Sequence, residues 1–324
     1  MYAEIRREIQ RLNDRYLFIM STAAVEKSDD TMQRCANCGV AEGDEIKLKK
    51  CTACYLVQYC GVKCQKDHRP KHKKECKKRA AELKDENLFK QPESNHLGDC
   101  PICCLPLPID VTKSGLYTCC GKRICTGCSY ANGKREREAR LKHNCPFCRK
   151  TQPSTYEEAI EQAMKRVEAN DPFATGQMGT ERCKIGDYKT GFEYLTKAAS
   201  LGDVESHFQL SRMYREGVGV EKDEKKHLYH AEKAAIGGHP EARHNLACVE
   251  GRQGRLERAV KHYIIAAKLG CDPSMGGLKN LYRDGLVSKD DFEAALRGYQ
   301  TSIAAMKSPQ REEANNLRDW RMGV

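Results

Sequence analysis

The sequence has few aromatic residues and no long apolar run, which limits the classes of protein to which it can belong. Aromatic side chains make up 7% of the 324 residues, tryptophan occurs once, and charged residues reach 31%. One large hydrophobic core is therefore not expected, and small modules with amphipathic helices fit better. The apolar run at residues 16–20 is far shorter than the ~20 residues of a membrane span. We expect a charged leader over residues 1–34 and no membrane partner.

Cysteine, by contrast, is abundant and clustered. Sixteen of the nineteen cysteines lie between Cys35 and Cys148, mostly as Cys-x-x-Cys pairs, and no compact secretory signal precedes them. A disulfide across that spacing is strained, whereas two thiolates two residues apart can hold one tetrahedral zinc ion. The pattern predicts zinc binding in a reducing compartment, which is the cytoplasm or the nucleus.

The first cysteine-rich segment, residues 35–76, contains eight candidate ligands for two zinc ions. Two pairs in it are spaced four residues apart, which places each pair on one face of a helix. The eight ligands are Cys35, Cys38, Cys51, Cys54, Cys60, Cys64, His72 and Cys76.

From Cys51 onward this spacing resembles that of the MYND-type zinc finger. The resemblance implies interleaved sites, in which the first and third pairs share one zinc ion and the second and fourth pairs share the other. The family often has tryptophan three residues before the ligand histidine, where this sequence has Arg69. Its members mostly bind short proline-containing peptides, so a protein or peptide is the expected partner of this finger.

Residues 61–79 hold nine Lys and Arg residues against two acidic ones. Such a patch is typical of nucleic-acid contact or of a nuclear import address. The alternative is that the basic residues balance the negative charge of zinc–thiolate sites. Because no aromatic residue is interleaved for base stacking, we favour charge balance and do not expect a nucleic-acid partner.

A second cysteine-rich segment, residues 100–149, follows a helical linker over residues 77–99. Its cysteine pairs fit two more zinc sites, which gives about four zinc ions in the chain. The candidate ligands are Cys100, Cys103, Cys119, Cys120, Cys125, Cys128, Cys145 and Cys148.

The pairs resemble those of a RING finger, in which the first and third ligand pairs share one zinc ion and the second and fourth share the other. A RING finger usually has a histidine ligand where this sequence has Lys122, and an ammonium group cannot ligate zinc. Cys119 is the expected substitute and His143 is a spare candidate, while Cys104 is interpreted as a small buried thiol.

RING fingers of ubiquitin ligases bind a charged ubiquitin-conjugating enzyme, and three positions resemble that binding surface. They are Ile102 between the first ligands, Pro146 in the last pair and Arg149 directly after it. The charged segment 133–143, expected to be helical, has no aromatic anchor of the kind that many ligases carry. Ligase activity is therefore an alternative function, with a ubiquitin-conjugating enzyme as the alternative partner.

Beyond residue 154 the sequence repeats itself. Lys197-Ala-Ala, Lys233-Ala-Ala and Ile265-Ala-Ala are each followed by a glycine three residues on, with periods of 36 and 32 residues. Small residues where helices cross, at such a period, indicate stacked helix–turn–helix repeats. The segment resembles the Sel-like repeat, a relative of the tetratricopeptide repeat. We predict repeats at about 173–204, 205–240 and 241–273, with a shortened turn in the third.

A degenerate fourth repeat is expected to extend the domain over 154–309, with residues 290–300 as its second helix, before a polar tail at 310–324. A capping box at Ser154–Glu157 opens the domain. The predicted fold is mainly α, with two small zinc-stabilised modules followed by an α-helical solenoid of helix–turn–helix repeats. The order of the modules resembles that of predicted algal proteins.

The leading functional prediction is a zinc-binding adaptor that binds proteins through its finger and its repeat groove. The alternatives are a RING-type ubiquitin ligase whose repeats recruit substrate, and a nuclear regulator that contacts nucleic acid through the basic patch. We identify no catalytic motif in the sequence, and ubiquitin transfer is the one enzymatic activity that the sequence suggests.

Overall fold

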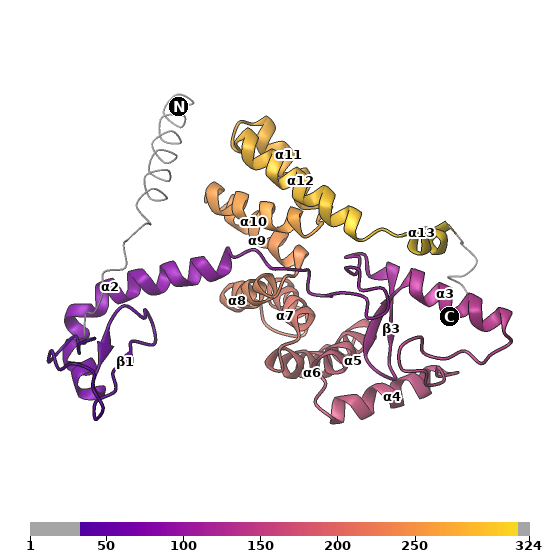
Figure 1. The fold of residues 1–324 in the computed structure, drawn as a ribbon, viewed down its shortest axis with the longest axis horizontal. Helices are drawn as coiled ribbons and strands as arrows, with labels where there is room; N and C mark the ends of the chain where they lie inside the picture. The colour runs from indigo at the N-terminus through magenta and orange to yellow at the C-terminus, as the bar shows by residue number, and fades with distance from the viewer. Residues whose placement is uncertain (1–32, 317–324) are drawn as a thin grey trace. The chain divides into compact units, whose positions relative to one another are not determined.

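The structure is a computed structural model that describes residues 33–316 (Figure 1). Most of the expected leader and the end of the expected tail lie outside this range. Contacts divide the chain into two compact units, one ending at Lys84 and the other beginning at Asp85.

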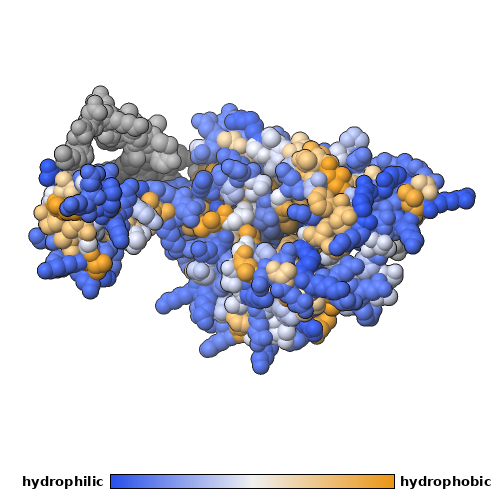
Figure 2. Space-filling view, turned by 60° about the horizontal axis from the view of Figure 1, so that its bottom comes forward, coloured by the Kyte–Doolittle hydropathy of each residue, from blue (hydrophilic) through white to orange (hydrophobic). Residues whose placement is uncertain are grey.

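Hydrophilic residues cover most of the face in Figure 2, between separate hydrophobic patches. Within the described range, no helix has both the length and the apolar character needed to cross a membrane.

The first unit is built around its cysteines. Strands β1 (Lys49–Lys50) and β2 (Gln58–Tyr59) pair antiparallel, and helix α2 (Val62–Leu88) follows them. The buried core consists of three cysteines and Tyr59, and Cys60, Cys64 and Cys76 pack against it. His72 and Cys76 lie on α2 as expected, but Cys60 precedes the helix and only Cys64 lies on it, so the prediction of a shared helical face for Cys60 and Cys64 is wrong. The helical linker expected over residues 77–99 is the end of the same helix, which stops at Leu88.

The second unit begins with the other cysteine-rich segment. A 3₁₀ turn, η1 (Val111–Lys113), leads into the antiparallel hairpin β3 (Ser114–Tyr117) and β4 (Lys122–Cys125), and helix α3 (Thr126–Glu138) follows. The helix predicted at 133–143 thus begins and ends earlier. Arg140 has a positive φ of 51°, which terminates the helical backbone. The core here joins Cys100, Cys125 and Cys128 to Leu107 and Ile124.

Nine helices between residues 156 and 305 form the repeat domain of the described chain, and each contacts the next in sequence. The mainly α fold of the prediction is confirmed. The helices are α4 (Tyr156–Glu168), α5 (Pro172–Lys184), α6 (Tyr188–Ser200), α7 (Val204–Glu216), α8 (Glu224–Ile236), α9 (Pro240–Arg252), α10 (Leu256–Lys268), α11 (Asp272–Arg283) and α12 (Lys289–Ala305).

The helix ends follow from the sequence. Thr155, one residue later than expected, caps α4 by accepting a hydrogen bond from the Glu158 amide at 3.2 Å. The glycines after the second helices, Gly202, Gly238 and Gly270, have φ values of 96°, 84° and 92°. Glycine adopts this left-handed backbone without the steric cost of a Cβ atom, so it turns each helix into the next.

The uneven repeat period arises in the turn within each repeat. The turn between α9 and α10, residues 253–255, is four residues shorter than the turn 217–223 that joins α7 to α8. The predicted shortening of a turn in the third repeat is therefore confirmed, and the turn between α5 and α6 is equally short. Gly217 begins the longer turn of the second repeat with φ 75° and ends α7 in the left-handed conformation.

Alanines form the contact between helix pairs. Ala231, Ala234, Ala235 and Ala242 are buried with Phe208 and Leu246 in one cluster, and Leu88 at the end of α2 joins it. Arg243 is fully buried beside them and donates hydrogen bonds to the carbonyl groups of Leu88 and Lys90. The segment that enters the second unit is thus held on the repeats.

The expected polar tail is instead partly a docked helix. Helix α13 (Pro309–Asn316) packs on α3 of the cysteine-rich segment, with Arg311 and Ala314 buried. An alanine built at Gly127 would collide with the backbone at Arg311, so only glycine permits this close approach. Residues 100–149 and the repeats therefore belong to one compact unit.

A buried histidine predicts a loss of stability in acid. His262 has no exposed surface. Burial, then the positive charges of Arg243 and Arg258, lower its pKa to about 3. Because the unfolded side chain titrates near 6.5, the unfolded state binds more protons between these values, and stability falls as pH falls from 6.5 toward 3. At pH 5 this site alone should cost roughly 2 kcal/mol.

The measurement is the free energy of unfolding at pH 7 and pH 5 for the parent and for His262→Gln. The variant should lose less stability on acidification than the parent, even if it is less stable at pH 7. Equal losses in both proteins would show that His262 does not titrate on unfolding.

Candidate metal centres

The described chain brings sixteen ligand side chains together as four separate groups. Within each group, the ligand atoms all lie within 4.8 Å of one another. The grouping is the one that the family resemblances implied. The groups are Cys35, Cys38, Cys60 and Cys64; Cys51, Cys54, His72 and Cys76; Cys100, Cys103, Cys125 and Cys128; and Cys119, Cys120, Cys145 and Cys148.

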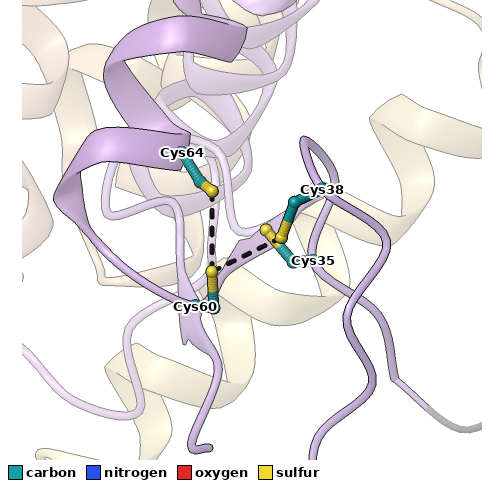
Figure 3. A group of neighbouring side chains, drawn as sticks. All are labelled: Cys35, Cys38, Cys60 and Cys64. Carbon is teal, nitrogen blue, oxygen red and sulfur yellow. Dashed lines mark hydrogen bonds between the residues drawn. The ribbon is translucent and has the colours of Figure 1, made fainter.

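The spacing of the sulfur atoms suits tetrahedral zinc. In the first group the Sγ atoms of Cys38 and Cys60 are 3.6 Å apart, and those of Cys60 and Cys64 are 3.5 Å apart (Figure 3). Figure 3 shows all four sulfur atoms pointing toward one centre. Four sulfurs at about 2.3 Å from a zinc ion lie about 3.8 Å from one another. These thiols therefore stand where zinc-bound thiolates would be.

The other groups have the same dimensions. The Sγ atoms of Cys103 and Cys125 are 3.8 Å apart, and the Sγ atom of Cys54 lies 3.2 Å from Nε2 of His72. In the last group the pairs Cys120–Cys145 and Cys119–Cys148 are separated by 3.7 and 3.4 Å. All donors are protein side chains, so each site would be closed and structural.

Four of the Cys-x-x-Cys turns share one backbone design. The residue after the second cysteine has a positive φ and donates its N–H group to the carbonyl of the first cysteine, at 2.8–2.9 Å. This turn points both sulfur atoms to one side. The residues with positive φ are Gly39, Tyr55, Cys104 and Arg149.

This design corrects the interpretation of Cys104. Its side chain is exposed, not buried, because the left-handed turn directs it away from the ligand group.

His143, the spare candidate, is not a ligand. Its Nδ1 atom lies 2.9 Å from a carboxylate oxygen of Glu136, whose other oxygen accepts from the Asn144 amide. Cys119 lies with Cys120, Cys145 and Cys148 in the fourth group.

The thiol pKa values show why a cation is needed. Burial raises the pKa of Cys35, but hydrogen bonds from the Cys38, Cys60 and Asn37 backbone outweigh it and lower the pKa to about 6. Hydrogen bonds with Cys64, Cys38 and Cys35 raise the pKa of Cys60 to about 12. In this group the thiols therefore cannot all ionise near neutral pH unless a cation offsets their repulsion, and zinc supplies that charge.

Arg311 of α13 reaches the third group from outside. Its Nη2 atom donates to Sγ of Cys103 at 3.4 Å and to the Leu105 carbonyl at 3.2 Å, and its Nη1 atom donates to the Pro106 carbonyl at 2.7 Å. A guanidinium at this distance favours the thiolate form of the ligand and fixes the loop that carries it. The C-terminal helix is therefore part of the surroundings of this metal group.

The three residues expected to contact a partner are not equally available. Ile102 is 42% exposed and Arg149 is exposed, but Pro146 is buried. Its neighbour Phe147 is 44% exposed, and the ammonium group of Lys122 lies 5.9 Å from the Phe147 ring centre. Phe147 rather than Pro146 therefore offers the apolar surface on the last zinc turn.

His96, Glu205 and His239 form a partly buried cluster that was not predicted from the sequence. Both Nε2 atoms approach one Glu205 oxygen, at 3.4 Å from His96 and 3.2 Å from His239. His239 Nδ1 accepts from the Ala242 amide as the cap of α9, so its Nε2 atom carries the proton. The two rings are stacked 4.2 Å apart at 15°.

That geometry suits a hydrogen-bond clamp and does not suit a metal ion. A metal would have to lie in the plane of each ring, and two stacked rings do not share a plane. Burial raises the pKa of Glu205, but the hydrogen bonds from His239 and His96 outweigh it and hold the pKa well below its usual range. Nothing in the local sequence links His96 to the other two residues.

The comparisons with known proteins cover the first cysteine-rich segment and the repeats. Residues 35–76 match the MYND finger, and residues 173–203, 204–239 and 240–271 match the Sel1 repeat. The chain therefore contains a MYND finger, which is a zinc-binding module, and three Sel1 repeats. The predicted resemblances to these two families are confirmed.

The chain is also similar to the DAP3-binding cell death enhancer 1 proteins of Rattus norvegicus and Mus musculus, with 24% identity over 201 residues. The match spans 50% of this chain but only 40% and 39% of those relatives. Among solved structures, a Sel1 repeat protein from Oxalobacter formigenes is 19% identical and covers 60% of this chain and 85% of its own, with a TM-score of 0.40. The c5321 antigen of uropathogenic Escherichia coli is 20% identical and covers 59% of this chain and 40% of its own, with a TM-score of 0.37.

Replacement of Cys119 tests the ligand set of the fourth group. Cys119→Ser should bind one zinc ion fewer than the parent chain, because a neutral hydroxyl replaces a thiolate. Cys104→Ser is the matched control, since this thiol lies next to a ligand but points away from the group. Native mass spectrometry gives the zinc count. A full count for Cys119→Ser, or a loss in Cys104→Ser, would contradict this assignment.

Proposed function

We propose that this protein is an adaptor that holds about four structural zinc ions and binds a client protein on its Sel1 repeats. The observation that carries the proposal is the presence, in one chain, of a MYND finger and a Sel1 array, which are both protein-interaction modules. Solenoid repeats present extended surfaces to their partners. The closed ligand sets give the zinc ions a structural role and leave no position for an activated water.

A groove on the first repeats is the proposed client site. It has a volume of about 430 Å³ and is lined by residues of α5, α6 and α7 and by the turn that follows α7. Arg212 and Glu216 supply charge, while Tyr188 and Val218 supply apolar surface. This mixture is suited to a peptide segment with both apolar and charged side chains.

The relatives suggest a first candidate client. Their name describes them as DAP3-binding, and the match to them spans half of this chain. We therefore propose a DAP3-like protein as the first client to test. The MYND finger would bind a second, shorter segment, and its exposed Tyr55 and Leu56 give it apolar surface for a proline-containing peptide.

Reversing one charge in the groove tests this site. Arg212→Glu should weaken binding of purified DAP3 by about tenfold or more, equivalent to about 1.4 kcal/mol, because it places a second acidic side chain beside Glu216. Arg283→Glu on α11 makes the same change of charge at an exposed position outside the groove and should leave affinity unchanged. Isothermal titration calorimetry measures both.

If the two variants bind DAP3 equally well, the groove is not the site. If the parent chain does not bind DAP3 at all, the client is a different protein. Circular dichroism on both variants verifies that the repeats remain folded.

A ubiquitin ligase is the second candidate function, and the exposure of one surface favours it. Ile102 and Phe147 are both exposed on cysteine turns, while α13 packs on α3 of the same segment. The Arg149 guanidinium donates to Asn132 at 3.3 Å, which holds it beside the last zinc turn. The surface expected to receive a conjugating enzyme is therefore open.

Discharge of ubiquitin from charged conjugating enzymes tests the ligase hypothesis. The full chain is used, because α13 contributes to the third metal group. If the chain is a ligase, Ile102→Ala and Phe147→Ala should each reduce discharge at least about tenfold, since both remove apolar contact area. Leu141→Ala, at another exposed apolar residue, is the control. If the zinc-loaded parent discharges ubiquitin from none of the conjugating enzymes in a panel, the ligase hypothesis is wrong and only the adaptor proposal stands.

A further inference from the structure

Helix α2 carries an unbalanced row of lysines, which we call the lysine stripe. At about 100° per residue, five lysines between Lys63 and Lys77 fall within one arc of about 100°, and no acidic residue of this stretch shares that arc. The ligands that α2 carries, Cys64, His72 and Cys76, fall on the opposite side of the helix. The stripe consists of Lys63, Lys66, Lys73, Lys74 and Lys77, and all five are exposed.

Charge balance with zinc does not account for the stripe. Residues 33–84 contain fourteen Lys and Arg residues and six acidic ones, a net charge of +8. A zinc ion with four thiolates has a charge of about −2, and one with three thiolates and a histidine has about −1. The two sites therefore offset only three of the eight positive charges, and a net charge of about +5 remains.

The stripe is also free of internal ion pairs. Among the described residues, none of its five lysines lies within ion-pair distance of a carboxylate, whereas Lys78 and Arg79 both pair with Glu82, at 4.0 and 3.2 Å. The acidic residues of α2 near the ligands lie outside the arc. The five ammonium groups thus remain available to an external anion.

We propose that the lysine stripe binds the phosphate backbone of double-stranded nucleic acid, without sequence preference. From Lys63 to Lys77 the helix rises about 21 Å, which matches about six base pairs along one strand. Lysines act as point charges for phosphate, and the stripe has no Asn, Gln or Arg with which to read base edges.

An acidic protein is the less suitable partner for this surface. Protein interfaces are depleted of lysine and depend on aromatic or aliphatic anchors. Apart from Pro70, the arc presents no apolar side chain between Lys63 and Lys77. It has no aromatic residue either, which also disfavours single strands, because these require stacking platforms.

The test is fluorescence anisotropy of the full chain with labelled 20-base-pair duplexes of DNA and of RNA, from 50 to 200 mM salt. Five phosphate contacts predict a slope of log affinity against log salt of about −4.5, or a loss of about 500-fold over that range. Lys66→Glu/Lys73→Glu/Lys77→Glu should bind at least about 30-fold more weakly at 100 mM salt and should show a shallower slope.

Lys189→Glu/Lys225→Glu/Lys279→Glu is the matched control. These three exposed lysines lie on the repeats, and the variant has the same net charge as the stripe variant. It should retain affinity to within about threefold. Zinc content, measured by native mass spectrometry, verifies that both variants remain folded.

Three results would overturn the proposal. The first is no binding of either duplex at 50 mM salt, and the second is an equal loss of affinity in the two triple variants. The third is tighter binding of a polyglutamate peptide than of both duplexes, which would assign the stripe to an acidic protein instead. A difference between the DNA and RNA duplexes identifies the preferred backbone.

Discussion

Repulsion between converging thiolates is the constraint on which both cysteine-rich segments depend. Four sulfur atoms within 4.8 Å of one another cannot all carry negative charge unless a cation lies between them. In the first unit, Tyr59 is the one non-cysteine residue in the buried cluster around the ligands. Zinc binding would therefore be coupled to folding in this unit.

Two buried arginines connect segments of the second unit that lie far apart in the sequence. Arg311 contacts a ligand sulfur and two carbonyl groups of the loop behind it, and α13 packs on α3. Arg243 holds the entering segment on the repeats by bonding to its carbonyl groups. The second cysteine-rich segment is thus anchored on one side, and its Ile102 and Phe147 side chains remain exposed. Such a unit presents a zinc-turn surface and a repeat groove at fixed positions within one body.

The ligand groups could be predicted because they depend on local spacing. A Cys-x-x-Cys turn directs two sulfur atoms to one side by itself, and the family resemblance supplied the pairing of turns. The repeat helices could be predicted as well, since Ala-Ala steps and terminal glycines recur at fixed intervals. Even the substitution of Cys119 for a histidine followed from Lys122, which cannot ligate zinc.

The errors arise where tertiary contact decides. Pro146 is buried within its module, and Cys104 is exposed because of its left-handed backbone; the spacing of the cysteines reveals neither. The C-terminal segment looked like a polar tail because its buried arginine is satisfied by carbonyl groups more than 200 residues earlier in the sequence. His96 and His239 share Glu205 only because the chain folds back over the repeats.

Zinc binding by the four closed ligand groups is tested most directly by the mass of the intact parent chain. Native mass spectrometry of protein purified under reducing conditions should show four zinc ions per chain. It should also show loss of the fold of residues 35–76 when a chelator removes the metal. A folded chain that carries no zinc, or one whose ligand cysteines are paired as disulfides, would show that these groups do not bind structural zinc.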